Sequence, residues 1–141
     1  MKLFSRVLGE GQPLLIIHGL FGMSDNWQSL ANLYSDYFEV HLIDQRNHGR
    51  SPHADEFSYL HLSNDLHQYI LDNKLNDVII MGHSLGGKTA MQFAVSYPEF
   101  LSKLIIVDIS PRFYPIHHNK IIEGLKMLDF SILKSRSQAD V

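Results

Sequence analysis

The sequence predicts an α/β fold built on a doubly wound, mainly parallel sheet. Short apolar runs rich in β-branched residues alternate with longer amphipathic stretches, and the runs cover residues 14–17, 38–43, 78–81 and 104–107. Most of these runs show no alternation of apolar and polar residues, which is typical of strands covered on both faces. A strand followed by a helix and another strand favours right-handed crossovers, and therefore parallel pairing.

The amphipathic stretches between the runs are expected to form helices. They span residues 26–34, 59–71 and 85–97, and Pro98 stops the last of them. In the middle stretch Leu62, Leu66 and Ile70 recur at helical spacing, and Ser58 is placed to cap the first turn. Residues 3–8 are expected to add an antiparallel edge strand before a glycine-bearing turn.

Composition indicates one globular domain and excludes several functional classes. Of the 141 residues, 45% are hydrophobic and 19% charged, and the formal net charge is only -3, so no strong field favours nucleic acid or an anionic membrane. The chain contains no cysteine, which excludes disulfides and fits a reducing compartment, so we expect a cytoplasmic location. No run is long enough to span a membrane, and the nine histidines show no metal-binding spacing. We therefore expect no metal or cofactor.

The turn at Ser84 carries the strongest chemical signal. Gly82 and Gly86 flank this serine at two residues on either side, between an expected strand and an expected helix. This pattern is typical of a nucleophile elbow, whose strained turn needs small neighbours so that the serine oxygen projects from the carboxyl edge of the sheet. Ser84 is thus predicted to be a catalytic nucleophile.

The same residues also satisfy a different pattern. Residues 82–89 match the phosphate-binding loop Gly-x-x-x-x-Gly-Lys-Thr, and Asp108 after its apolar run resembles the acidic partner that holds magnesium in such enzymes. Both interpretations require a strand before the loop and a helix after it. The local pattern therefore leaves a nucleotide-binding phosphotransferase open as an alternative.

A second glycine-bearing loop follows the strand at residues 14–17. In a hydrolase its backbone amides can face a developing oxyanion, with Leu20 and Leu85 supplying the two N–H donors. Taken alone the loop can also be a simple tight turn, but its occurrence together with the Ser84 turn favours the oxyanion hole. The residues expected to line the substrate site are His18, Gly19, Phe21 and His83.

Two further segments are expected at the same edge of the sheet. Residues 44–51 are dense in hydrogen-bonding side chains, and we expect a loop network in which the Asp44 carboxylate and the Arg46 guanidinium pair, rather than a substrate contact. Asp108 is predicted to orient a catalytic histidine, the alternative being an aspartate that only starts a turn. His83 is expected to pack against a nearby loop rather than to act as the base, and Lys88 to be solvated.

Four motifs in order resemble the α/β-hydrolases, especially small bacterial esterases. They are residues 18–22 with 26–27, residues 44–51, residues 82–88 and residues 107–111. The resemblance implies that Ser84 is the nucleophile, that Leu20 and Leu85 line the oxyanion hole, and that Asp108 is the acid. It also implies that the lysine after the elbow binds no nucleotide, which leaves little support for the phosphate-loop alternative.

The resemblance covers only the amino-terminal half of such an enzyme. It implies a hydrolase core over residues 1–111, the start of a helical cap over 112–141, and a catalytic histidine beyond further strands that this sequence does not contain. His117 and His118 follow Asp108 too closely in the chain to replace that catalytic histidine. We therefore expect a serine hydrolase that acts on a small-molecule ester or acyl thioester through an acyl-enzyme, or else a catalytically incomplete fragment of one.

Overall fold

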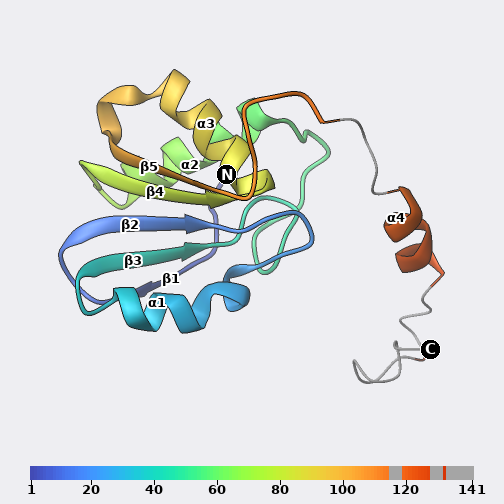
Figure 1. The fold of residues 1–141 in the computed structure, drawn as a ribbon, viewed down its shortest axis with the longest axis horizontal. Coiled ribbons are helices and arrows are strands. Elements are labelled where there is room, and N and C mark those ends of the chain that lie inside the picture. The colour runs from blue at the N-terminus through green and yellow to red at the C-terminus, as the bar shows by residue number, and fades with distance from the viewer. Residues whose placement is uncertain (115–118, 128–131, 133–141) are drawn as a thin grey trace. The chain divides into compact units, whose positions relative to one another are not determined.

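The structure is a computed structural model that describes residues 1–114, 119–127 and 132 (Figure 1). It contains two compact units, Met1–Pro111 and Arg112–Val141, which we describe separately. The first unit holds every strand of the described residues, and the second holds one helix.

The first unit is built on a five-stranded sheet in the order β1-β3-β2-β4-β5. The strands are β1 (Ser5–Leu8), β2 (Gln12–Ile17), β3 (Phe38–Ile43), β4 (Val78–His83) and β5 (Leu101–Val107). β1 runs antiparallel to β3, and the other pairs are parallel. The predicted mainly parallel sheet and its antiparallel edge strand are both confirmed.

Helices cover both faces of this sheet. They are α1 (Gln28–Tyr34), preceded by a 3-10 turn at Ser24–Trp27, then α2 (Tyr59–Asp72) and α3 (Leu85–Ser96). α1 lies on one face, and α2 and α3 lie on the other (Figure 1). The Ser58 hydroxyl accepts a hydrogen bond from the His61 N–H at 3.3 Å, so the predicted cap of α2 is confirmed.

The two faces carry separate cores that share the strand β2. Leu15 and Ile17 pack toward the core that contains Phe93 of α3, whereas Leu14 and Ile16 pack toward the core of α1. Successive side chains of a strand point to opposite faces, so a strand covered on both faces must be apolar at every position. This accounts for the absence of alternation in the run at residues 14–17.

β5 departs from the prediction that the runs without alternation are covered on both faces. Leu104 and Ile105 are 38% and 39% exposed. β5 pairs with β4 on one side and is the edge of the described sheet, so its apolar side chains lack the neighbours that cover β2 and β4. The prediction of a strand at residues 104–107 is confirmed, but the prediction that both of its faces are covered is wrong.

The second unit contains α4 (Asn119–Lys126), which lies within residues 112–141, where the start of a helical cap is expected. Ile121 and Leu125 are 52% and 40% exposed on this helix. His117 and His118 lie outside the described residues. Within the described part of the chain, no helix combines the length and apolar character needed to cross a bilayer.

Candidate active site

One residue with a strained backbone follows each parallel strand. The left-handed φ values are 62° at Phe21 after β2, 64° at Asn47 after β3, 50° at Ser84 after β4 and 53° at Asp108 after β5. Non-glycine residues rarely adopt such values, and they cluster at functional sites where the surrounding structure enforces them. Two further residues of this kind, Lys74 and Asp77, precede β4, so the carboxyl edge of the sheet holds four of the six that the structure describes.

Ser84 forms the sharp turn between β4 and α3. Its φ and ψ are 50° and -112°, and its carbonyl accepts a hydrogen bond from the Lys88 N–H at 3.1 Å as the helix begins. A Cβ on Gly82 would lie 2.3 Å from the Gly86 carbonyl oxygen, and one on Gly86 would lie 2.3 Å from the Ile17 carbonyl oxygen. Only glycine fits at either position, which is the geometry of a nucleophile elbow.

The loop after β2 lies directly against this elbow. A Cβ on Gly19 would lie 3.3 Å from the Ser84 Cβ, and the Gly22 N–H closes the loop by donating to the Gly19 carbonyl at 3.0 Å. Leu20 follows Gly19 in this loop, and Leu85 provides the first amide of α3, which has no acceptor within its own helix. The two residues predicted for the oxyanion hole thus belong to adjoining segments.

His18 joins this loop to its neighbour. Its side chain is buried, its Nδ1 lies 2.8 Å from the Gly19 carbonyl, and its Nε2 accepts a hydrogen bond from the Gln45 N–H at 3.1 Å. A carbonyl only accepts, so the proton is on Nδ1 and the ring is neutral. Burial lowers the pKa of His18, in agreement with this state. The ring has no free nitrogen for the substrate contact that the sequence predicted, and in this structure it ties two loops together.

Asp108 lies beside the elbow because β5 is bonded to it. The Ser84 N–H donates to the Val107 carbonyl at 3.1 Å, and Asp108 is the next residue along the chain. Its side chain is 87% exposed and lies 3.8 Å from the His83 Nε2. The carboxylate is therefore accessible to a further hydrogen-bond donor at the edge of the sheet.

Two open hollows flank the loop formed by residues 20–22, which contributes to both. One has a volume of about 370 Å³ and includes Trp27, Leu30 and His83, and the other has about 500 Å³ and includes His48 and Phe57. The His83 ring packs against Gly19, as expected, and its centroid lies 6.0 Å from that of Trp27. Phe21 is 52% exposed between the hollows.

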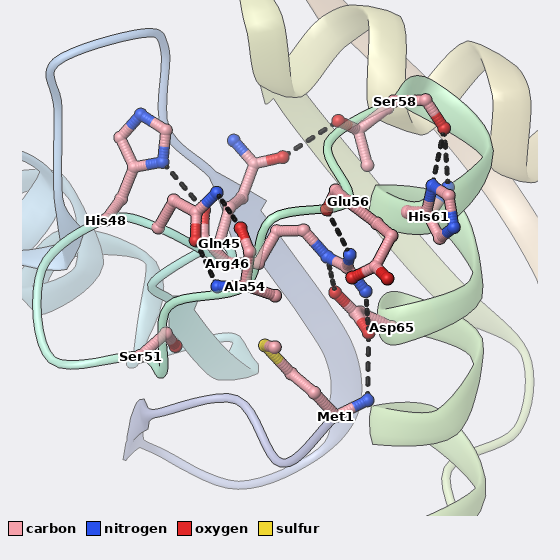
Figure 2. Close-up of polar contacts among 12 residues, drawn as sticks. Met1, Gln45, Arg46, His48, Ser51, Ala54, Glu56, Ser58, His61 and Asp65 are labelled. Carbon is pink, nitrogen blue, oxygen red and sulfur yellow. Dashed lines mark hydrogen bonds and ion pairs between the residues drawn. The ribbon is translucent and has the colours of Figure 1, made fainter.

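The loop at residues 44–51 is a structural network, but its predicted ion pair is wrong. Asp44 accepts hydrogen bonds from the backbone N–H groups of Ser24 at 2.5 Å and Arg50 at 2.9 Å. Arg46 instead pairs with Asp65 of α2, through Nε to Oδ2 at 2.5 Å and Nη2 to Oδ1 at 2.9 Å (Figure 2). Asp44 thus binds backbone donors, whereas the guanidinium pairs with a carboxylate from another element.

Asp65 is ionised despite its burial. Burial alone would raise the pKa of this carboxyl, but hydrogen bonds from the Arg46 guanidinium and from the Met1 amino group at 2.8 Å outweigh it, so the pKa is lowered. Figure 2 shows the guanidinium between Asp65 and the Glu56 backbone, to whose carbonyl Arg46 Nη1 donates at 2.5 Å. Arg46 therefore anchors the loop to α2.

The geometry disfavours the phosphate-loop alternative. A phosphate-binding loop needs open space enclosed by its amides, whereas a Cβ on Gly87 would already lie 3.0 Å from the Gly82 carbonyl oxygen. The hydroxyl of Thr89, which would bind magnesium, is buried and donates to the Gln45 Oε1 at 2.8 Å. Lys88 is half-buried, whereas a solvated lysine was expected. Residues 82–89 fold as a turn and a helix packed on their own backbone.

Sequence reasoning missed Gln45, Thr89 and Asp65 as members of this site's framework. Gln45 lay within a polar run, Thr89 entered only as part of the phosphate-loop pattern, and Asp65 lay in the predicted middle helix. A charged residue at a position that helical spacing places on the buried face was the one available signal for Asp65.

The family model described as alpha/beta hydrolase fold matches residues 12–131. The chain belongs to the α/β-hydrolase family. This α/β-hydrolase chain is 39% identical over 127 residues to a Haemophilus influenzae protein that bears the name esterase/lipase, covering 89% of this chain and 44% of that protein. It is 38% identical over 113 residues to an sn-1-specific diacylglycerol lipase of Danio rerio, covering 79% and 36%.

A solved structure of a marine microorganism esterase is also similar to this α/β-hydrolase chain. The TM-score is 0.94 with 51% sequence identity, and the match covers 99% of this chain and 56% of the esterase. The chain thus spans between about one third and just over one half of the length of these relatives.

Proposed function

We propose that this chain carries the nucleophile, the oxyanion donors and the acid of a serine hydrolase that cleaves carboxylic esters. The observation that supports this most directly is the strained Ser84, which lies against Gly19 on one side and is bonded to the strand that ends before Asp108 on the other. Three functional groups of acyl transfer would then meet at one edge of the sheet.

The proposed reaction follows from these positions. The Ser84 Oγ attacks the carbonyl carbon of the ester while an imidazole base takes its proton, and the carbonyl oxygen becomes an oxyanion facing the Leu20 and Leu85 N–H groups. The imidazolium returns the proton to the departing alcohol, which leaves an acyl-enzyme, and water then releases the acid. Asp108 accepts a hydrogen bond from the imidazole and stabilises its cationic form.

The substrate we propose is a small-molecule ester with apolar groups on both sides of the carbonyl. The two hollows flank the loop that carries Leu20, which we call the oxyanion loop (residues 19–22), and both contain apolar side chains, among them Leu30 and Phe57. The names of the relatives, which include esterases and a diacylglycerol lipase, support an oxygen ester. Acyl thioesters would react by the same steps, so a matched ester and thioester pair measures the preference.

The base is assigned to none of the described residues. The chain alone is then a hydrolase that has its nucleophile but reacts slowly, because a serine without a base keeps the high pKa and weak nucleophilicity of an alcohol. Added imidazole should accelerate ester cleavage by the chain, and Ser84→Ala should abolish that acceleration. Fast cleavage without imidazole would instead mean that the chain supplies its own base.

Labelling with a fluorophosphonate in the presence of added imidazole tests the nucleophile, because the chain without a base reacts slowly. Ser84→Ala should abolish labelling, whereas Ser63→Ala should leave it unchanged. Ser63 is a matched control, because its hydroxyl is buried in α2 and has no hydrogen-bond partner among the described residues. Labelling that persists in Ser84→Ala would exclude the proposed nucleophile.

A further inference from the structure

We propose that Gln45 is a positioning residue that fixes the spacing between the two halves of the oxyanion hole. The two donors belong to different segments, since Leu20 lies on the loop after β2 and Leu85 begins α3. Gln45 follows a third strand and is bonded to both segments. This inference rests on the proposed function and adds to it the element that aligns its donors.

The side chain of Gln45 uses both ends of its carboxamide. Nε2 donates to the His18 carbonyl at 2.9 Å, and Oε1 accepts from the Thr89 hydroxyl at 2.8 Å. The backbone N–H of Gln45 also donates to the His18 Nε2 at 3.1 Å. Gln45 and Thr89 are 3% and 1% exposed, so water does not replace these bonds when one is lost.

These contacts form a continuous connection between the two donor residues. Thr89 Oγ1 lies 3.1 Å from the Leu85 carbonyl oxygen and 2.8 Å from the Gln45 Oε1. The connection therefore begins at Leu85, which supplies one of the two oxyanion donors. From Gln45 it passes to His18, whose Nδ1–H is bonded to the Gly19 carbonyl, and Leu20 comes next in the chain. We call His18, Gln45 and Thr89 the Gln45 link.

The surroundings hold Gln45 in place. The next residue, Arg46, is anchored to Asp65 of α2 by two hydrogen bonds, and Asp44, the preceding residue, is bonded through its own backbone N–H to the Phe4 carbonyl at 3.0 Å. The link therefore connects the donors to a fixed point rather than to a mobile loop. Glutamine suits the position because its carboxamide offers a hydrogen-bond donor and an acceptor together at the end of one neutral side chain.

Removing either end of the link should misalign the donors without removing them. Thr89→Val keeps the shape of the side chain but leaves the Gln45 Oε1 buried without its donor, and Gln45→Met removes both carboxamide bonds. Losing one oxyanion donor outright slows acyl transfer by about 100- to 1,000-fold, so misalignment should give a smaller loss of about tenfold. The rate of the double variant should lie no more than about twofold below that of the slower single variant, because both substitutions act through one connection.

The first readout is the phosphonylation of Ser84 by a fluorophosphonate in the presence of imidazole, analysed as a maximal rate and an apparent affinity. Thr89→Val and Gln45→Met should lower the maximal rate about tenfold and leave the apparent affinity unchanged, because the substitution acts on the transition state. Thr89→Ser, which keeps the hydroxyl, should restore the rate to within about threefold. Ile70→Val is the control for stability, since it lies in the core of α2 and should leave labelling unchanged.

The second readout does not depend on reactivity. The Gly22 N–H is bonded to the Gly19 carbonyl inside the oxyanion loop, and its hydrogen exchange reports whether the loop is held. Exchange at Gly22 should accelerate at least about fivefold in Thr89→Val and Gln45→Met but not in Ile70→Val. Unchanged exchange at Gly22, or an equal loss of labelling in the core control, would overturn the proposal. If the unsubstituted chain is not labelled at Ser84 even in the presence of imidazole, the proposed function fails, and exchange at Gly22 alone decides whether the link holds the loop.

Discussion

Replacing Gly86 with Ala should lower both the stability of the fold and the reactivity of Ser84, because the first turn of α3 is packed against the end of β2. A Cβ at this position would lie 2.3 Å from the Ile17 carbonyl oxygen and 2.6 Å from the His18 carbonyl oxygen. The nearer distance is about 1.1 Å shorter than the 3.4 Å at which ordinary van der Waals contact begins. Both atoms belong to the backbone and cannot rotate away, so α3 must move by about 1 Å.

The size of each effect follows from that displacement. Overpacking costs about 3 kcal/mol where the neighbours are rigid, and the better helix propensity of alanine offsets about 1 kcal/mol of it, leaving a loss of about 2 kcal/mol. A displacement of about 1 Å in a catalytic group slows reaction about 100-fold, so phosphonylation of Ser84 should fall by about that factor.

Urea unfolding followed by circular dichroism measures the stability, and fluorophosphonate labelling measures the reactivity. The matched control is Gly124→Ala in α4, where an added Cβ meets nothing within 4 Å and no loss is expected. A Gly86→Ala variant as stable and as reactive as the unsubstituted chain would refute the argument that close backbone approach forces glycine at this elbow.

Three further outcomes are expected. Burial lowers the pKa of His41 despite its hydrogen bond to Glu39, so the unfolded chain binds a proton near pH 6.5 before the folded chain does. Stability should therefore fall as the pH drops below about 6.5, and His41→Gln should make urea unfolding at pH 7.5 and 5.0 more alike. Asp65→Asn should cost about 3 kcal/mol in the same assay, because it leaves the buried Arg46 guanidinium without its counter-charge; a loss below about 0.5 kcal/mol would contradict this. Asp108→Ala should change stability by less than about 0.5 kcal/mol, since the side chain is 87% exposed, yet slow ester cleavage at least about tenfold in the imidazole-supplemented reaction, because the imidazolium loses the carboxylate that stabilises it. Unchanged cleavage would remove Asp108 from the proposed mechanism.

The sequence predicted the elements of this fold because their signals are local. A run such as residues 14–17 is apolar at every position because both faces of β2 are covered, and Ser58 caps α2 through the residues that follow it directly. Glycine spacing around Ser84 likewise predicted a strained turn, which the φ of 50° confirms. Each of these inferences depends on neighbours within a few residues of the chain.

The remainder depends on which distant segments meet. Nothing in the run at 104–107 indicates that β5 would be the edge of the described sheet, because burial is decided by neighbours that the run does not contain. Arg46 pairs with Asp65, 19 residues away, rather than with the nearer Asp44. The contact of Gln45 with Thr89 joins residues 44 apart. The predicted pair of Arg46 with Asp44 was wrong because tertiary packing, not proximity in the sequence, brings Asp65 next to the guanidinium.

The identity of the residue that becomes acylated is the most direct test of the proposed site. The chain would be incubated with p-nitrophenyl butyrate in the presence of imidazole, quenched in acid, digested and mapped by mass spectrometry. We expect a butyryl group on the peptide that contains Ser84, located on that serine, and no adduct in Ser84→Ala. A butyryl group on another residue, or release of p-nitrophenol by Ser84→Ala at an equal rate after subtraction of the rate with imidazole alone, would exclude Ser84 as the nucleophile.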